Sequence, residues 1–361
     1  MRKILFIIDN LAGGGAERVI VNIANGFVEN NIPVELLVGN KIGVYFDILH
    51  PSIPVSEVGG ISLLKYLQVL PAIFKKNNYT HIFTTGQYVS AAAIISKQLI
   101  HAKAKIYQTH HYSHPKKRKL RYWKGDLFLK FLYYFTVSSA DKIIAVSKGS
   151  LEWLRKFSHR KLPQGIFIYN PVFDNTIYKQ ANEPVNFPID TNNKTVLLTA
   201  GRLTEEKDHF TLIKAFCIYK KTNNKSILFI LGAGPSQQNL QHYIAAQQLQ
   251  NDIILVGFET NPYKWMNKCD VFILSSINEA FGNVIVEAMA LGKTVVSTNC
   301  WGPNEILNEG KFGYLCPIQD PVQMADAISK AVSKPIDKDL LINESKQYTI
   351  DEIVKEYIKI L

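Results

Sequence analysis

The feature that most constrains this chain is a repeated alternation of short apolar segments with helical stretches. A helical pattern from about Ala16 to Asn30 follows the first apolar segment. Uninterrupted apolar, β-branched strands separated by helices are typical of parallel sheets covered on both faces. The first half therefore predicts one parallel sheet, with strands at Ile4–Ile8, Val34–Val38, His81–Thr84, Lys105–Gln108, Lys142–Val146 and Ile166–Tyr169.

The same pattern starts again in the second half, which indicates a second domain. A chain of 361 residues also exceeds one hydrophobic core. We expect an α/β protein of two doubly wound domains, divided at Asn170-Pro171 into residues 1–171 and 172–344. The second-half strands are Val196–Ala200, Ile227–Leu231, Ile253–Val256, Val271–Leu274 and Thr294–Ser297, and its helices are Phe210–Lys220, Gln237–Leu249 and 284–291.

Positive charge is concentrated in the first half. Residues 1–180 hold 24 lysines and arginines against 10 acidic residues, whereas residues 181–361 hold 17 against 20. The densest run is 116–124, which precedes the aromatic segment LFLKFLYYF. Basic residues beside aromatic ones suit an anionic membrane surface, and a solvated loop is the alternative. No helix-turn-helix, RNP strand or zinc finger is present in the sequence, so we expect no nucleic-acid partner.

The remaining composition indicates a cytoplasmic protein. Four cysteines show no CxxC pair and no metal-ligand spacing, as expected of reduced residues. The opening apolar run is interrupted by Asp9, which favours a strand over a signal peptide. No stretch reaches the ~18 apolar residues of a membrane-spanning helix. We expect a cytoplasmic protein, peripheral on the inner face of the cell membrane.

Ligands of open parallel sheets bind at the carboxyl ends of the strands, so candidate residues are expected there. Gly13, Gly14 and Gly15 follow the first strand and allow close approach of a ligand to a helix start. A dinucleotide site is the alternative, although the third glycine of that motif is missing. His110 and His111 end the strand at 105–108 and His114 lies nearby in the sequence, and any of the three rings can contact a substrate hydroxyl. We favour His111.

Two cations follow the first strand of the second domain. Arg202 can bind phosphate oxygens as a fork, and Lys207 adds a point charge. Together they can neutralise a pyrophosphate leaving group without a metal ion. The alternative is two solvated cations at a helix start, where the helix dipole disfavours them. Phe258 follows another strand of this domain and can wall a nucleobase pocket.

A pair of acidic residues flanks a turn in SINEAFGNVIVEAMALG. Glu279 is predicted in a loop at the end of a strand, and Glu287 on the helix that follows. The turn at Phe281, Gly282, Asn283 and Val284 offers backbone amides to a phosphate or sugar oxygen. One acid suits sugar hydroxyls and the other ribose hydroxyls. A loop charge and a helix-dipole partner form the alternative interpretation.

With these motifs together, the chain resembles the retaining glycosyltransferases of family 4, which have the GT-B fold. The resemblance runs from GGGAERV through GRLTEEKDH and EAFGNVIVEAMALGKTVVST to the closing QYTIDEIVKEYIKIL. It implies two Rossmann-like domains facing across a cleft: an acceptor-binding domain at 1–171 and a nucleotide-sugar-binding domain at 172–344. A C-terminal helix, 345–361, would cross back onto the first domain.

The resemblance also implies a role for each candidate residue. Arg202 and Lys207 would bind the donor diphosphate, and Glu279 with the amides of Phe281 to Val284 would hold the donor sugar. Glu287 would bind ribose, Phe258 would lie against the base, and His111 would contact the sugar. Gly14 and Gly15 would abut the phosphate and acceptor side. No cofactor and no metal ion would be required. Asp337-Lys338-Asp339 spells a DxD, which we interpret as a chance match.

We therefore expect a hexosyltransferase that retains anomeric configuration. It would move a hexose or N-acetylhexosamine from a nucleotide-sugar, UDP-linked in preference to GDP-mannose, to a lipid-linked, lipopolysaccharide or capsule glycan. Such a transfer would serve lipopolysaccharide, O-antigen or capsule assembly. Two alternatives stay open from the sequence. One is a non-catalytic glycan-assembly scaffold with the same fold, and the other is a nucleotide-dependent oxidoreductase.

Overall fold

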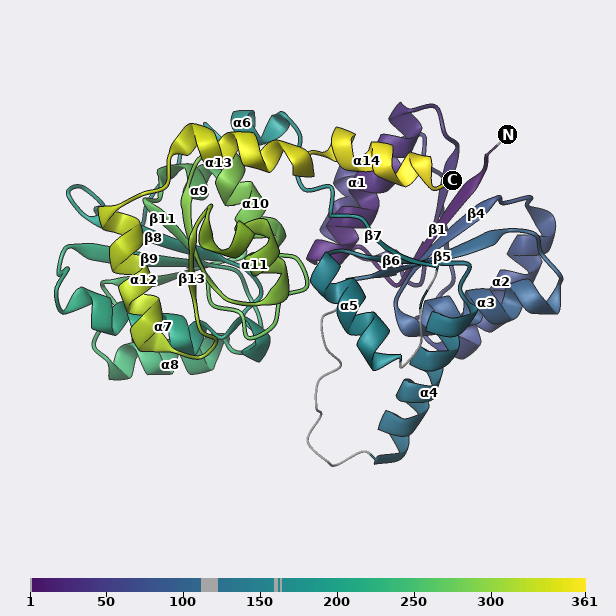
Figure 1. Ribbon diagram of the computed structural model, residues 1–361, viewed down its shortest axis with the longest axis horizontal. Coiled ribbons are helices and arrows are strands. Elements are labelled where there is room, and N and C mark those ends of the chain that lie inside the picture. Colours follow the sequence, from purple (N-terminus) through teal and green to yellow (C-terminus); the bar gives the residue numbers. More distant parts are fainter. Residues whose placement is uncertain (1, 112–122, 159–161, 163) are drawn as a thin grey trace. The chain divides into compact units, whose positions relative to one another are not determined.

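The computed structural model describes residues 2–111, 123–158, 162 and 164–361, and it divides the chain into two compact units (Figure 1). Unit 1 comprises Met1–Pro171 and Ile350–Leu361, and unit 2 comprises Val172–Thr349. Each unit contains one wholly parallel sheet. The chain passes into unit 2 beside the point where it leaves, because the Val172 amide donates to the Tyr348 carbonyl at 2.9 Å.

The sheet of unit 1 has the order β3-β2-β1-β4-β5-β6-β7. β1 pairs with β2 on one side and with β4 on the other, and Phe6 lies opposite both Leu36 and Phe83. The chain order therefore reverses direction between β1 and β4. The strands are β1 (Ile4–Ile8), β2 (Val34–Val38), β3 (Val55–Glu57), β4 (His81–Thr85), β5 (Lys105–His110), β6 (Lys142–Ala145) and β7 (Gly165–Phe167).

Alternate residues of β1 supply the two hydrophobic cores of unit 1. Ile4, Phe6 and Ile8 pack with α1 and α14, whereas Leu5 and Ile7 pack with α2, α3, α4 and α5. This alternation is the two-residue period of a strand buried on both faces. The helices are α1 (Gly15–Glu29), α2 (Leu63–Lys76), α3 (Gln87–Leu99), α4 (Trp123–Ser139), α5 (Lys148–Phe157) and α14 (Ile350–Lys359).

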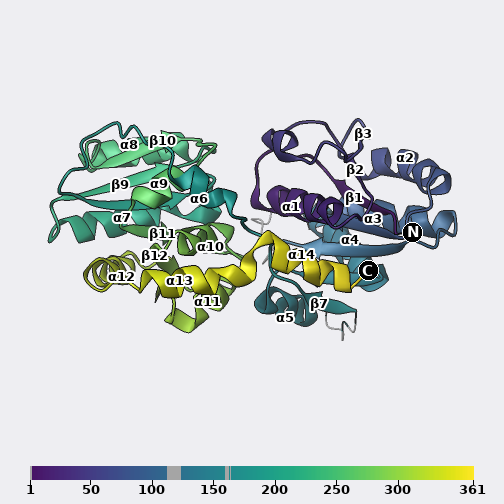
Figure 2. The same ribbon diagram turned by 90° about the horizontal axis from the view of Figure 1, so that it is seen from above.

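Helix α14 lies along α1 in both views of the ribbon (Figures 1 and 2). Ile353, Val354 and Tyr357 of α14 are buried in the core of unit 1. The Tyr107 hydroxyl of β5 donates to the Ile360 carbonyl at 2.8 Å. The final helix therefore belongs to unit 1 and begins at Ile350, later than the predicted start at 345.

The sheet of unit 2 has the order β10-β9-β8-β11-β12-β13. Its strands are β8 (Thr195–Ala200), β9 (Ser226–Leu231), β10 (Ile253–Gly257), β11 (Val271–Leu274), β12 (Thr294–Thr298) and β13 (Tyr314–Cys316). Its helices are α6 (Thr176–Ala181), α7 (His209–Lys220), α8 (Gln237–Ala246), α9 (Tyr263–Lys268), α10 (Asn283–Ala290), α11 (Trp301–Ile306), α12 (Pro321–Ser333) and α13 (Lys338–Ser345).

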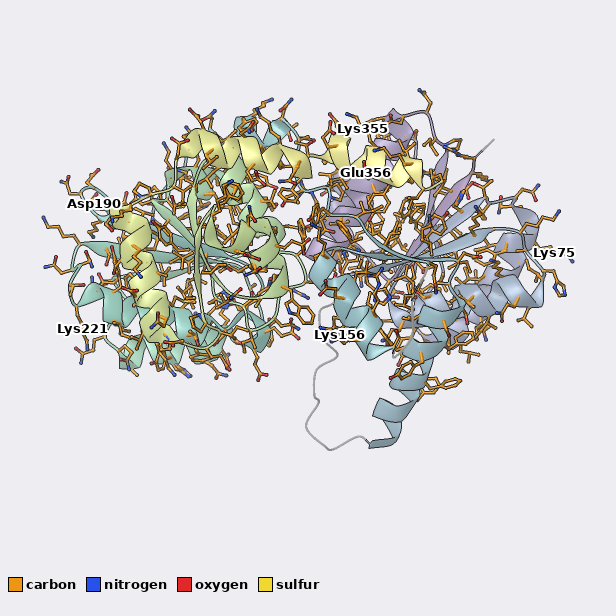
Figure 3. The ribbon with its side chains drawn as sticks, in the orientation of Figure 1. Lys75, Lys156, Asp190, Lys221, Lys355 and Glu356 are labelled. Carbon is orange, nitrogen blue, oxygen red and sulfur yellow. The ribbon has the colours of Figure 1, made fainter. Side chains whose placement is uncertain are left out.

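Charged side chains point outward from both units. Lys75 of unit 1 and Lys221 of unit 2 extend away from their sheets (Figure 3). Both are exposed, as burial of an unpaired charge would be costly. In the part of the chain that the structure describes, no helix is both long and apolar enough to traverse a bilayer.

Candidate functional site in unit 2

The site is built where the strand order of unit 2 reverses. β8 pairs with β11, with Leu197 opposite Val271 and Leu198 opposite Phe272. The chain continues from β8 towards β9 on one side and from β11 towards β12 on the other. Loops leaving two such neighbouring strands part from each other, and the crevice between them is the usual ligand site of an open parallel sheet.

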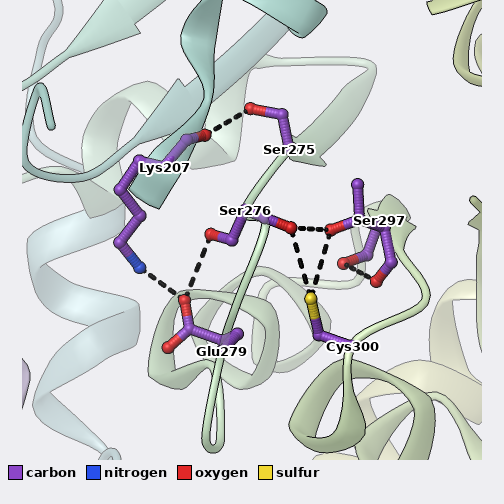
Figure 4. Close-up of polar contacts among 7 residues, drawn as sticks. Lys207, Ser275, Ser276, Glu279, Ser297 and Cys300 are labelled. Atoms are coloured by element: carbon purple, nitrogen blue, oxygen red, sulfur yellow. Dashed lines mark hydrogen bonds and ion pairs between the residues drawn. The ribbon is translucent and has the colours of Figure 1, made fainter. Parts of the chain in front are cut away.

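Lys207 and Glu279 come together at this reversal of strand order (Figure 4). The Lys207 ammonium donates to Glu279 Oε2, and the exposed fractions of the two side chains are only 23% and 17%. The loops that carry them are also joined through main-chain groups. Ser275 Oγ donates to the Lys207 carbonyl at 2.7 Å, and the Ile277 amide donates to the Glu206 carbonyl at 2.8 Å. A cation and a carboxylate are thus fixed at the carboxyl ends of adjacent strands.

Arg202 lies on the same loop as Lys207, after β8. Its side chain is exposed, and it has no ion-pair partner among the residues described here. The loop itself is ordered by backbone bonds, since the Leu203 amide donates to the Ala233 carbonyl at 3.0 Å. An exposed guanidinium on a fixed loop is available to an anion, and its fork geometry suits phosphate oxygens.

The turn after Glu279 leads directly into α10. Gly282 precedes the helix with φ +108°, a conformation in which a side chain would be strained. No side chain caps the amino end of α10, in contrast to α13, where Asp337 accepts from the Leu340 amide at 2.8 Å. Phe281 is buried and packs edge-on against Tyr348, with ring centroids 5.6 Å apart. This turn therefore places backbone amides beside the carboxylate of Glu279.

Glu287 is half-buried one turn into α10. Its Oε1 accepts a hydrogen bond from the Tyr263 hydroxyl of α9 at 3.1 Å. Phe258 follows β10, and 60% of the residue's surface is exposed. An aromatic ring left open at the end of a strand can stack on a planar base. The ribose role of Glu287 and the nucleobase role of Phe258 stay predictions.

The DxD of the sequence has a structural role at the start of α13. Asp337 is the N-cap of that helix, and its carboxylate accepts from the Leu340 amide. Within the described ranges, no group of three histidine, cysteine or acidic side chains lies close enough to hold a metal ion. The four cysteines are unpaired thiols.

In unit 1, the glycine candidates lie at the start of α1. Gly14 is the N-cap of that helix, and Gly15 is its first residue. Gly13 has φ +107°, so a side chain there would be strained. A Cβ on Gly14 would lie 2.2 Å from a carboxylate oxygen of Glu17, which would force that side chain to move.

His110 is the last residue of β5 and His111 follows it, and the two residues differ in accessibility. His110 is buried, with its ring edge-on to Tyr133 of α4 at 5.7 Å, whereas His111 retains partial exposure. Burial, and next the neighbouring His111, lowers the pKa of His110 to about 3; burial lowers the pKa of His111 to about 4. Both rings are therefore neutral near pH 7. Nε2 of each ring is buried and has no hydrogen-bond partner among the described residues, so either neutral ring can exchange one hydrogen bond with a ligand that reaches it.

Two candidate residues were missed in the sequence. Ser276 Oγ donates to Glu279 Oε2 at 3.3 Å, and it lies three residues before that glutamate. Asp9 follows β1 directly, at the carboxyl end where ligand-binding residues gather. That position is a signal that the sequence contains, whereas no local pattern singles out Ser276.

Two family profiles match the chain, one for each half. The profile described as Glycosyltransferase Family 4 matches residues 13–172. The profile described as Glycosyl transferases group 1 matches residues 183–348, which include the Lys207–Glu279 pair. Both are glycosyltransferase families, which leaves the oxidoreductase alternative without support.

The chain is also similar to named proteins. It is 32% identical over 201 residues to N-acetylgalactosamine-N,N'-diacetylbacillosaminyl-diphospho-undecaprenol 4-alpha-N-acetylgalactosaminyltransferase of Campylobacter jejuni, over 55% of this chain and 53% of that one. The match thus spans about half the length of that relative. The chain is 30% identical over 278 residues to an uncharacterized glycosyltransferase, MJ1059, of Methanocaldococcus jannaschii, over 65% of this chain and 67% of that one.

Among solved structures, Alr3699/HepE of Anabaena in complex with UDP has the same fold. The TM-score is 0.81, with 21% sequence identity and 99% of both chains covered. This likeness extends over both units and identifies the architecture as GT-B.

Proposed function

The chain belongs to the glycosyltransferases described as group 1, and we propose that it transfers a hexose or N-acetylhexosamine from a nucleotide-sugar to a lipid-linked glycan. The observation that carries this proposal is the pairing of Lys207 with Glu279 at the strand-order reversal of unit 2. A diphosphate and its attached sugar need a cation and a hydrogen-bond acceptor close together, and this pair supplies both.

A UDP-sugar is the favoured donor, with GDP-mannose next. HepE, which has the same fold, was solved in complex with UDP. In this chain the ribose hydroxyls would donate hydrogen bonds to the carboxylate of Glu287. The base would stack on the exposed ring of Phe258. The Tyr263 hydroxyl supports this assignment, because its hydrogen bond to Oε1 orients the carboxylate of Glu287.

The reaction breaks the bond between the anomeric carbon and the diphosphate oxygen, and the electron pair leaves with that oxygen. Arg202 and Lys207 would stabilise the developing negative charge, which is the main electrostatic task of such a transfer. A hydroxyl oxygen of the acceptor bonds to the same face of the anomeric carbon, so the configuration is retained. Its proton passes to the departing diphosphate. Because two protein cations neutralise that charge, we propose that no metal ion is needed.

Glu279 would hold the sugar while this bond breaks. Lys207 and Ser276 both donate to its Oε2, so Oε1 can accept from a sugar hydroxyl. The amides at the start of α10 would bind further sugar or phosphate oxygens. The neutral ring of His111 would exchange a hydrogen bond with the sugar without adding a charge.

A lipid-linked acceptor is proposed from two observations. The printed name of the Campylobacter relative specifies a diphospho-undecaprenol acceptor for that protein. In unit 1 of this chain, α4 presents Phe128, Phe131 and Tyr134 to solvent while burying Leu132 and Val137. Exposed aromatic side chains of this kind suit a membrane interface. The basic run 116–124 directly precedes them in the sequence, but it lies largely outside the described residues.

The test measures nucleotide binding first and transfer second. UDP, GDP, UDP-sugars and GDP-mannose are added to the full chain, and the rise in melting temperature is recorded. UDP and its sugars are expected to give the largest rise, because a ligand that binds only the folded state stabilises it. Mass spectrometry of products formed on undecaprenyl-diphosphate glycans then identifies the donor.

Variants assign the binding to this site. Arg202→Met and Lys207→Met are expected to abolish most of the nucleotide-dependent rise. Lys220→Met is the matched control, because Lys220 is also ion-paired, with Asp252 at 2.8 Å, but lies at the far end of α7. A wild-type protein with no response to any nucleotide would favour the scaffold alternative. Turnover of unphosphorylated sugars alone would contradict the proposed donor class.

A further inference from the structure

The sheet of unit 1 has its own strand-order reversal, between β1 and β4. Asp9 is the first residue after β1, and Gly86 is the first after β4. By the rule used for unit 2, the carboxyl ends of these two strands are an expected place for a ligand. None of the donor-binding residues assigned above lies at this reversal, except that the glycines before α1 follow on the same loop.

The Asp9 carboxylate is held in a fixed position at this reversal of strand order. The Tyr66 hydroxyl of α2 donates to Asp9 Oδ1 at 2.9 Å, and the Tyr66 side chain is fully buried. The main chain is fixed as well, since the Asp9 carbonyl accepts from the Asn40 amide at 2.9 Å. Burial raises the pKa of Asp9, and the hydrogen bond from Tyr66 lowers it in part. Burial of an ionised carboxylate costs free energy, which indicates that Asp9 has a specific binding or structural role at this position.

The second oxygen of Asp9 is left for another donor. Among the described residues, Tyr66 is the only group that donates to this side chain, and it uses Oδ1. Oδ2 is directed towards Gly86, where a Cβ would lie 3.9 Å away. Gly86 has φ +97°, a conformation that favours glycine, so no side chain covers the carboxylate from that direction. The result is a half-satisfied carboxylate beside a backbone without a side chain.

We propose that Asp9, positioned by Tyr66, binds a hydroxyl group of the acceptor at the β1–β4 reversal of unit 1. This inference rests on the proposed transferase function and names the chemistry of its acceptor. An ionised carboxylate only accepts hydrogen bonds, so its ligand must donate, as a sugar hydroxyl does. The same charge disfavours a phosphate group at this point, so the diphosphate of a lipid-linked acceptor would lie elsewhere.

A purely structural role would be to satisfy the buried Tyr66 hydroxyl. Asp9→Asn separates the two roles, because the amide oxygen can still accept from Tyr66 while the negative charge towards Gly86 is lost. The control is Glu35→Gln. Glu35 also accepts from a tyrosine hydroxyl, that of Tyr79, but it lies near the amino ends of the strands, where it also pairs with Lys3 at 2.8 Å.

The experiment uses the full chain and four uncharged probes: the octyl β-glycosides of glucose, galactose, N-acetylglucosamine and N-acetylgalactosamine. Binding is measured by saturation-transfer NMR, and transfer is measured with the donor identified above. Asp9→Asn is expected to weaken probe binding and raise the acceptor KM by about 10- to 100-fold, the range for a lost hydrogen bond to a charged group. Its kcat at saturating acceptor and its UDP-dependent melting rise should stay near wild type.

Tyr66→Phe tests the positioning role. It should raise the acceptor KM less than Asp9→Asn does, with the UDP response unchanged, and Glu35→Gln should leave both quantities as in wild type. Equal probe binding by Asp9→Asn and wild type would overturn the inference, as would a wild-type protein that binds none of the four glycosides. Failure of the transferase proposal is seen separately, as a wild-type protein whose melting temperature does not respond to any nucleotide.

Discussion

Lys207 and Glu279, 72 residues apart in the chain, form an ion pair at the strand-order reversal of unit 2. The proposed function assigns them to different parts of one donor, Lys207 to the diphosphate and Glu279 to the sugar. Without a ligand each satisfies the other's charge. A bound donor would bring an anion to the Lys207 ammonium and hydroxyls to the Glu279 carboxylate. Both side chains are already largely buried in the ion pair, so donor binding would remove little further water from them.

Replacing Glu279 by Gln should lower the rate of transfer by a factor on the order of 10² to 10³, since a charged contact to the reacting sugar is lost. UDP binding should persist, because Lys207 and Arg202 remain. Steady-state kinetics and the UDP-dependent melting rise measure the two effects. Glu259→Gln is the control: Glu259 pairs with Lys264, and their exposed fractions of 18% and 22% are close to those of the candidate pair. Equal rates in the two variants would remove Glu279 from the proposed mechanism.

Two glycines at strand ends of unit 2 predict different costs of substitution. Gly232 has φ +134° and a Cβ there would lie 1.9 Å from the Gly201 carbonyl oxygen, whereas Gly257, at φ +92°, has open space. Gly257→Ala should cost about 1–2 kcal/mol of unfolding free energy from backbone strain alone. Gly232→Ala adds a collision between backbones worth about 1–3 kcal/mol more.

Urea unfolding of both variants measures these costs. In Gly232→Ala the added Cβ would displace Gly201, which precedes Arg202 on the same loop, so this variant should also weaken UDP binding. Gly257→Ala should weaken UDP binding less. Equal unfolding free energies for the two variants would show that the loop after β8 moves away from the added Cβ with no loss of unfolding free energy.

Acid should destabilise unit 1 through its buried histidines. Burial lowers the pKa of His110 to about 3, and those of His81 and His111 to about 4, from an ordinary value of 6.5. As the pH falls from 6.5 towards 4, these three histidines therefore take up protons in the unfolded chain but stay neutral in the folded chain. The histidines' contribution to the free energy of unfolding is complete above pH 6.5. It declines between pH 6.5 and 4, by at most about 1.4 kcal/mol per pH unit for each histidine.

His110→Phe should lower the number of protons taken up on unfolding by up to one, so stability should decline less steeply with falling pH. The phenylalanine ring can retain the packing against Tyr133. Melting temperatures between pH 7 and pH 4.5 measure the slope. His242→Phe, which removes an exposed ring from α8, serves as control. Parallel slopes for wild type and His110→Phe would show that His110 takes up a proton equally in both states.

The strand–helix alternation predicted the two sheets because buried parallel strands have an unmistakable apolar pattern. β3 and β13 were missed: each has three residues, and Val55–Glu57 is largely polar, so neither carries a period to detect. Lys207 and Glu279 were found because both follow strands. Their direct contact depends on β8 pairing with β11, a long-range relation that no local pattern contains. The partnership of Asp9 with Tyr66 was hidden for the same reason, since those residues are 57 positions apart.

The proposed membrane surface predicts that charge reversal in 116–124 releases the protein from anionic vesicles. Lys116, Lys117 and Lys119 changed to Glu should weaken binding to phosphatidylglycerol-containing liposomes by a factor on the order of 100 or more, because each basic residue near an anionic surface contributes about 1 kcal/mol. The control changes the exposed Lys75, Lys76 and Lys103 of unit 1 to Glu, which alters net charge equally.

Aromatic insertion is tested separately from charge. Phe128 and Phe131 are exposed on α4, with 48% and 66% of their surface accessible, so changing both to Ser should not disturb the core of unit 1. Sedimentation of this variant with liposomes should fall at high salt, where screening removes the electrostatic share and apolar burial remains. If the lysine variant sediments as wild type does, the basic run does not bind the membrane. If only the control lysines matter, net charge rather than this segment attracts the protein to the vesicle.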